Sequence, residues 1–194
     1  VMETVRAHRH ILAILVVCLF LIGWFSLLLW YGPNAIVEFI GVENAYLVIF
    51  LLAISGGLSS FTSAPFYAAL LTFAAGGADP LILGLVAGLS ISIGDMLFFT
   101  LGRVALAETK LKNHWLVEKI KALLARAPRW GVPGLVFFYT AITPFPNDIL
   151  MVSLGTLKER PLVVAPWLAL GNTLQMIAVT HGVAYSISFL EWFA

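Results

Sequence analysis

The stretch TPFPND, residues 143–148, sets two prolines, an amide and a carboxylate inside an otherwise apolar run. Pro144 and Pro146 each remove an amide donor and clash with the preceding turn, at a cost of about 3 kcal/mol in a helix interior. We therefore predict that the helix breaks here and that the chain turns back. The competing interpretation is a single straight helix from Val132 to Leu154.

The composition indicates that this break lies in a lipid bilayer. Hydrophobic residues make up 61% of the 194 positions and charged residues only 11%, whereas soluble domains average about 45–50% and about 25%. The single cysteine excludes a disulfide framework and a cysteine metal site. We expect an all-α polytopic membrane protein that holds no metal ion and no other cofactor.

The first apolar run, residues 11–31, is long enough to cross a hydrocarbon core of about 30 Å as a helix. We predict a retained transmembrane helix rather than a signal peptide, because the run is too long and no small-residue cleavage site follows it. Gly32 and Pro33 would end this helix. Residues 1–44 are thus predicted to be a transmembrane helix and an external loop.

The eleven basic residues fall into three clusters, at residues 6–9, 103–129 and 158–160. The positive-inside rule places all three in the cytoplasm, with the N-terminus inside and the C-terminus outside. Residues 45–78 must then enter from the outside and return there, and residues 131–157 must enter from the inside and return. Both segments are shorter than the roughly 40 residues of two full crossings, so each is predicted to be a re-entrant helical hairpin.

A re-entrant hairpin places its tip at membrane depth. The first tip would lie near Ser63 and Pro65, in a segment rich in Gly, Ser and Pro, and the second at Pro144 and Pro146. Non-helical backbone is tolerated at that depth only where it is buried in protein or lines a wet cavity. Both tips are therefore expected to face inward and to take part in transport or gating.

The two hairpins share a sequence pattern. In each, a Pro-Phe pair is followed by a glycine eleven residues after the proline, and then by a proline that would open the next helix. The resulting units, residues 45–103 and 131–194, each combine a hairpin with a transmembrane helix. Because the hairpins open to opposite faces, the units are predicted to be inverted repeats, the plan of many secondary transporters.

Two intramembrane acids are candidate gating groups. Asp95 and Asp148 would each cost about 2.5–3.5 kcal/mol to insert, and such residues are functional candidates by default. For Asp148 the alternative is that it, or Asn147, caps the returning helix. For Asp95 the alternative is a bond to a neighbour within a packing seam, because the small residues Gly84, Gly88 and Ser92 precede it on one helical face.

Other polar residues lie near these acids in the predicted membrane segments. Arg103 is eight residues beyond Asp95 and either pairs with it or lies at the membrane boundary. Asn172 and Gln175 are three residues apart, so they share a helical face and either line a polar path or hydrogen-bond to another helix. His181 is a weaker candidate for a proton carrier.

Between the two units, residues 104–130 are predicted to form a cytoplasmic amphipathic helix. Apolar side chains fall near one face and lysines on the others, which is typical of a helix lying on anionic lipid. A nucleic-acid partner is not expected, because no groove-reading motif accompanies the basic residues. The lysines expected to attract headgroups are Lys110, Lys112, Lys119 and Lys121.

Enzyme motifs are missing. The sequence has no H-E-x-x-H, no G-x-S-x-G, no Walker glycine loop and no Cys/His cluster. The one enzymatic alternative is intramembrane catalysis by the pair Asp95 and Asp148. We expect a protein that is not an enzyme.

Two stretches resemble a known family. GLVAGLSISIGDMLFFTLGR, residues 84–103, is similar to the Gly-Asp and Gly-Arg signature of the DedA/VTT (SNARE-associated) membrane proteins, and TPFPNDILMVSLG resembles their second re-entrant loop. The resemblance covers about residues 45–190. It implies two oppositely facing re-entrant hairpins and a role in moving lipids between leaflets, by proton-coupled recycling of polyprenyl phosphate carriers or by translocation of phospholipids.

The chain also departs from this family. Members often carry an acid in the first hairpin, where this chain has SSFTSAP, and an arginine before the second loop, where it has Tyr139 and Thr140. These departures favour a downhill scramblase over proton-coupled transport. We expect a transporter or scramblase for phospholipid or polyprenyl phosphate headgroups in a prokaryotic plasma membrane, with lipids, protons and further copies of itself as candidate partners. A small ion or solute transporter and a non-transporting scaffold are the alternatives.

Overall fold

The computed structural model describes residues 19, 22–24, 26–27, 29–56, 63–104, 119, 122, 130–143 and 147–193. Within these residues the regular structure is entirely helical, which confirms the predicted all-α class. The labelled helices are α2 (Val42–Gly56), α3 (Ser63–Ala75), α4 (Pro80–Val104), α6 (Gly131–Ile142), α7 (Asp148–Thr156) and α8 (Pro161–Phe193).

Two of these helices, α4 and α8, are long and apolar enough to cross a membrane, as expected of an integral membrane protein. With 25 residues, α4 is about 37 Å long. Both helices begin at the prolines predicted to open them, Pro80 and Pro161. Asp79 caps α4, because its Oδ1 accepts the backbone N–H groups of Leu81 at 2.8 Å and Ile82 at 3.0 Å.

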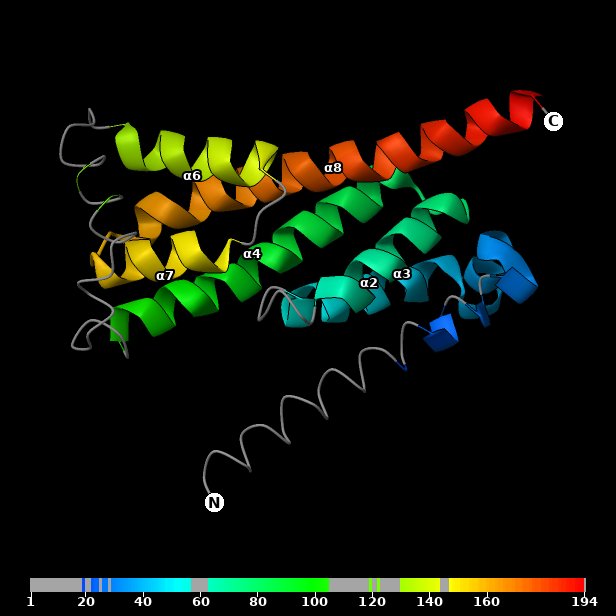
Figure 1. Cartoon of the computed structure of the whole chain (residues 1–194), viewed down its shortest axis with the longest axis horizontal. Helices are drawn as coiled ribbons and strands as arrows, with labels where there is room; N and C mark the ends of the chain where they lie inside the picture. Colours follow the sequence, from blue (N-terminus) through cyan, green and yellow to red (C-terminus); the bar gives the residue numbers. More distant parts are fainter. Residues whose placement is uncertain are drawn as a thin grey trace, which may run out of the picture.

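The remaining labelled helices come in two short pairs. Helices α2, α3, α6 and α7 contain 15, 13, 12 and 9 residues, or about 14–22 Å, so none reaches across a core of about 30 Å. Figure 1 shows α2 and α3 beside one half of the long helices, and α6 and α7 beside the other half. The straight helix from Val132 to Leu154 is wrong, because α6 ends at Ile142 and α7 begins at Asp148.

The long helices α4 and α8 pack antiparallel along the predicted seam. A Cβ added to Gly84 would lie 2.6 Å from the Cα of Ile177, and one added to Gly88 would collide with the Cα of Thr173. Only a residue without a side chain allows the two backbones to come this close. The packing-seam interpretation of the small residues that precede Asp95 is therefore confirmed.

The N-terminal region differs from the prediction. Gly32 and Pro33 were expected to end a helix, but residues 29–40 are helical, so this predicted helix end is wrong; the external position of the segment stays a prediction. Gly32 has a left-handed φ of +74°, so the backbone is distorted where the end was expected, but the helix continues through Pro33 to Ile40. The actual break is at Gly41, whose φ of +83° lets the helices Leu29–Ile40 and Val42–Ile54 meet at 100°.

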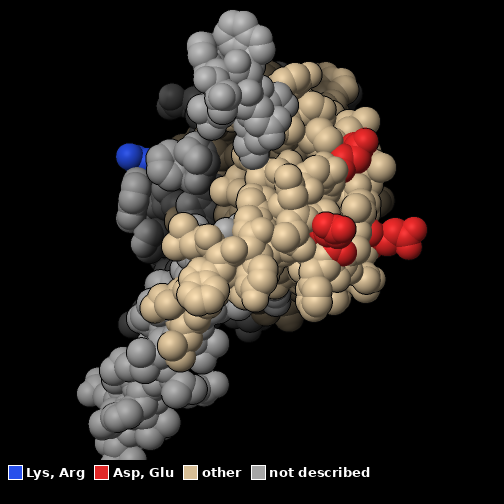
Figure 2. Space-filling view, turned by 90° about the vertical axis from the view of Figure 1, so that its right-hand side faces the viewer, with Lys and Arg blue, Asp and Glu red and all other residues tan. Residues whose placement is uncertain are grey.

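Apart from Lys119, the exposed charged side chains of the described residues fall into two groups, one at each end of α4. The acidic end, where α4 begins, carries Glu38, Glu43 and Asp79. Figure 2 looks onto this end and shows acidic side chains gathered on its right-hand side, with one basic side chain at the left edge of the view. The basic end, where α4 finishes and α8 begins, carries Arg103, Lys158 and Arg160, with Glu159 among them. This separation agrees with the positive-inside reasoning.

Several predicted residues lie outside the described part of the chain. These are Pro144 and Pro146, residues 57–62 of the first break, and most of the segment 104–130, including Lys110, Lys112 and Lys121. Lys119 is described and is exposed. The re-entrant character of the two helix pairs and the inverted repeat stay predictions.

Candidate functional site

A group of buried polar side chains lies between two apolar cores. The first core joins α2 and α3 to the long helices and reaches Ile91 and Met176. The second joins α6 and α7 to the long helices and includes Phe99 and Leu168. Asp95 lies between Ile91 and Phe99 on α4, and Asn172 lies between Leu168 and Met176 on α8. The two helix pairs therefore meet the long helices on either side of one polar layer.

Four side chains form this layer, which we call the Asp95 cluster: Asp95, Ser92, Asn147 and Asn172. The Oδ2 atom of Asp95 accepts one N–H from the amide of Asn147 at 2.9 Å and one from the amide of Asn172 at 2.8 Å. Asn147 also donates to Asn172 Oδ1 at 3.0 Å, and Asn172 donates to Ser92 Oγ at 3.1 Å. The cluster thus links α4, α8 and the residue directly before α7.

The cluster is closed and deep. Asp95 is 2% exposed and Asn172 is 1% exposed. Along α4, Asp95 is about 22 Å from Pro80 and about 14 Å from Val104, at 1.5 Å per residue. In a bilayer with a hydrocarbon core of about 30 Å, this position is near the middle. The prediction that Asp95 is an intramembrane carboxylate bonded to neighbouring helices is consistent with this geometry.

Helix α8 holds both sides of the break in TPFPND. Gln175 donates from Nε2 to the backbone carbonyl of Thr143, 2.9 Å away, at the end of α6. Asn172 accepts from Asn147, the residue before α7. The shared face of Asn172 and Gln175 is thus used for interhelical hydrogen bonding, as one alternative predicted; their role in lining a path stays a prediction.

Asn147 does not cap α7 with its side chain. It occupies the N-cap position, but it makes no side-chain cap hydrogen bond, because its amide is directed to Asp95 and Asn172. Asp148 lies in the first turn of α7, where the helix dipole favours a negative charge. None of the hydrogen bonds within the Asp95 cluster involves Asp148.

Arg103 does not belong to the cluster. Its Nη1 donates to the backbone carbonyl of Glu159 at 2.7 Å, about 12 Å along α4 from Asp95. The alternative in which Arg103 pairs with Asp95 is therefore wrong, and the favoured position at the membrane boundary fits the basic end. His181 also lies elsewhere, with its Nδ1 atom 2.9 Å from the Ile177 carbonyl of its own helix.

The predicted residues of the first break start α3. Ser63 is the first residue of that helix and Pro65 the third, and both are half-buried. The described residues place neither of them in a hydrogen bond of the Asp95 cluster. Their gating role stays a prediction.

Two members of the site were not assigned a role from the sequence. Ser92 was counted only as a small seam residue, although it is one turn before Asp95 on the same face. The Thr143 carbonyl was not considered at all, although carbonyls at the end of a broken helix need partners. The Thr143 carbonyl could have been found by asking where the broken helix places its free backbone groups, and Ser92 by its place one turn before Asp95.

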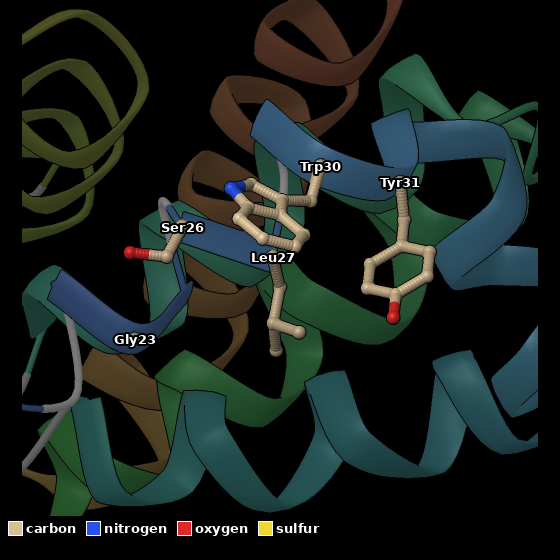
Figure 3. Close-up of a pocket in the computed structure, with 5 residues that line it drawn as sticks. All are labelled: Gly23, Ser26, Leu27, Trp30 and Tyr31. Carbon is tan, nitrogen blue, oxygen red and sulfur yellow. The ribbon is translucent and has the colours of Figure 1, made fainter.

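The structure also contains a surface pocket, formed by residues that are distant in sequence from the Asp95 cluster. Figure 3 shows its lining, which is Gly23, Ser26, Leu27, Trp30 and Tyr31. This lining has no carboxylate, no amide side chain and no basic group. It therefore offers little chemistry, and the Asp95 cluster is the better candidate site.

No family model, no curated protein and no solved structure matches this chain. The resemblance to the DedA/VTT proteins therefore stays an expectation based on the two motifs.

Proposed function

We propose that this chain is a transporter that moves the headgroups of membrane lipids between the two faces of the membrane. The observation that carries the proposal is the closed Asp95 cluster at the break between α6 and α7. A carboxylate near the middle of a membrane is costly, and such residues usually mark a substrate or ion path. The protein performs no chemical reaction in this proposal.

The short helix pairs support a transport role. Because α6 and α7 are too short to cross, we propose that they form a re-entrant hairpin from the basic end, and that α2 and α3 form one from the acidic end. Broken helices that meet at mid-depth are the usual substrate sites of secondary transporters. The basic end is then cytoplasmic and the acidic end external.

The charge at the basic end supports an anionic lipid as the substrate. Exposed Lys158 and Arg160 follow α7 directly and Arg103 ends α4, so a headgroup leaving the second hairpin would meet cations. The resemblance to the DedA/VTT proteins adds phospholipids and polyprenyl phosphates as the expected classes of substrate.

A specific observation favours a second candidate, a small ion or solute transporter. Asp95 and Asn172 are almost completely buried, and a closed site of this kind suits a small ion better than a headgroup whose acyl chains stay in the lipid. A non-transporting membrane scaffold is the remaining alternative.

Reconstitution separates the three. We expect proteoliposomes with the full chain to exchange fluorescent phospholipid between leaflets, and Asp95→Asn to slow this exchange at least tenfold. Asp79→Asn is the matched control, because Asp79 is an acid that caps α4 at the far end of the same helix, and asparagine retains the cap. Ion flux without lipid exchange would favour the second candidate, and neither activity would favour a scaffold.

A further inference from the structure

The buried carboxylate of Asp95 lacks a positively charged neighbour among the described residues. Its hydrogen-bond donors are the neutral amides of Asn147 and Asn172. Of the described cations, Arg103 is committed to Glu159 at the basic end, where Lys158 and Arg160 also lie. An ionised carboxylate inside hydrocarbon is strongly unfavourable unless a cation accompanies it. When Asp95 is ionised, no cation among the described residues balances its charge.

The atoms around this charge are mostly oxygens. Oδ2 of Asp95 accepts two N–H groups, and Oδ1 of Asn172 and Oγ of Ser92 each accept one. Carboxylate, carboxamide and hydroxyl oxygens are the ligands that hard cations prefer. Asp95 is the only carboxylate among the four members of the cluster, so a singly charged cation would neutralise the cluster itself. Asp148, one residue after Asn147, adds a second negative charge that interacts with Asp95.

The two carboxamides can serve in either of two states. A half-turn of the amide of Asn147 or Asn172 exchanges its NH₂ donor for its oxygen. The same side chains that now donate to Asp95 can therefore turn their oxygens toward a cation held by that carboxylate. This exchange would replace the direct hydrogen bonds between α4, α8 and the start of α7, so cation binding and the position of α7 are coupled.

The backbone around the break also favours a cation. Helix α6 ends at Ile142, and its C-terminal end carries partial negative charge. The N-terminal end of α7 carries partial positive charge, which disfavours a cation. Asp148 in the first turn of α7 reduces this effect because its carboxylate is negative. In transporters with broken helices, C-terminal helix ends of this kind coordinate coupling ions.

We propose that the Asp95 cluster binds one sodium ion, whose binding and release accompany transport; this inference rests on the proposed function. A proton is the other singly charged candidate. It would occupy one oxygen of Asp95 and leave the hydrogen bonds of the two carboxamides as they are, whereas a sodium ion would draw several oxygens of the cluster together.

Thermal unfolding of the purified full chain in detergent tests the inference without any transport assay. At fixed pH and ionic strength, replacing choline chloride with NaCl at one hundred times the Kd should raise the Tm by roughly 5 °C or more. Equilibrium binding of ²²Na⁺ should reach one ion per chain. Equal Tm values in both salts, or a Tm that responds to pH alone, would overturn the sodium site.

Variants locate the site. Asp95→Asn should abolish the sodium-dependent shift, and Asn147→Ala should raise the sodium concentration at half-effect about tenfold, as expected for the loss of about 1.4 kcal/mol. Asp79→Asn should keep the full shift. A shift that survives Asp95→Asn would place the ion elsewhere and overturn the inference.

The two proposals fail separately. Sodium binding without lipid exchange would keep the ion site and reject the lipid function. Lipid exchange without sodium binding would keep the lipid function and reject the ion site.

Discussion

The two helix pairs differ in what fills the space between them and the long helices. The α2/α3 pair buries apolar side chains such as Ile49, Phe66 and Phe73, each at most 1% exposed. The α6/α7 pair instead ends at the break with an amide and a carbonyl, Asn147 and Thr143, which bond to α4 and α8. Apolar packing holds both pairs against the long helices, and the second pair adds the hydrogen bonds that Asn147 and the Thr143 carbonyl make at its break. We infer that the first pair supports the fold and that the second takes part in transport.

The largest expected effect on stability comes from the first pair. Phe73→Ala removes a fully buried ring from its core and should lower the free energy of unfolding by about 3 kcal/mol. This value is at the low end for such a change. The substitution loses the packing contacts of the ring, but a ring inside a bilayer is surrounded by apolar groups in either state, so little free energy of transfer from water is lost. Unfolding in mixed micelles measures the loss. The rate of lipid exchange per folded molecule should stay within twofold of that of the parent chain. If this rate fell strongly while the protein stayed folded, the proposed difference between the two pairs would be wrong.

Asn147→Ala should have the largest effect on transport within the second pair. It removes hydrogen bonds to Asp95 and Asn172, so we expect exchange to fall at least tenfold while stability falls by only about 1–2 kcal/mol. The matched control is Thr72→Ala in the first pair, which removes the acceptor of the Trp24 indole N–H. Equal losses of exchange in the two variants would contradict the division of roles.

Gln175→Ala should have an intermediate effect. It removes the single hydrogen bond that α8 makes to the Thr143 carbonyl, at a cost of about 0.6–1.7 kcal/mol. Because this bond holds one side of the break, exchange should fall severalfold, less than for Asn147→Ala. An effect larger than that of Asn147→Ala would move the centre of the site from Asp95 to Thr143.

Arg103→Ala should have the smallest effect. Arg103 is exposed and outside the Asp95 cluster, so stability should change by no more than about 0.5 kcal/mol. Exchange of zwitterionic lipid should be unchanged, and exchange of anionic lipid should fall by no more than severalfold. A complete loss of both would restore Arg103 to the central site that the sequence had suggested.

The local rules of the sequence predicted the helix ends and the seam well. Proline at the first turn marks the starts of α4 and α8, and Gly88 marks the close approach of their backbones. The break in TPFPND follows from proline chemistry alone. Each of these features depends on residues close together in the chain.

The sequence did not predict partners that depend on how distant segments meet. Asn147 is 52 residues from Asp95, and either capping or a tertiary bond fits its position, so only the packing of α7 on α4 decides between them. Arg103 likewise reaches Glu159 rather than Asp95 because α7 ends beside the end of α4. The bend at Gly41 was missed because the helix end was assigned to Gly32 and Pro33, whereas the chain stays helical through that pair and turns at the next glycine, whose φ is +83°.

The measurement that tests the second hairpin most directly is the sidedness of residue 158. In a Cys18→Ser background, single cysteines at Lys158, Arg103 and Asp79 are labelled in intact cells with a maleimide that does not cross membranes. If α6 and α7 return to the face they leave, Asp79→Cys is labelled from outside, whereas Lys158→Cys and Arg103→Cys are protected until the cells are opened. Labelling of Lys158→Cys from outside, with Arg103→Cys still protected, would show that the TPFPND segment crosses the membrane and would contradict the proposed transport site.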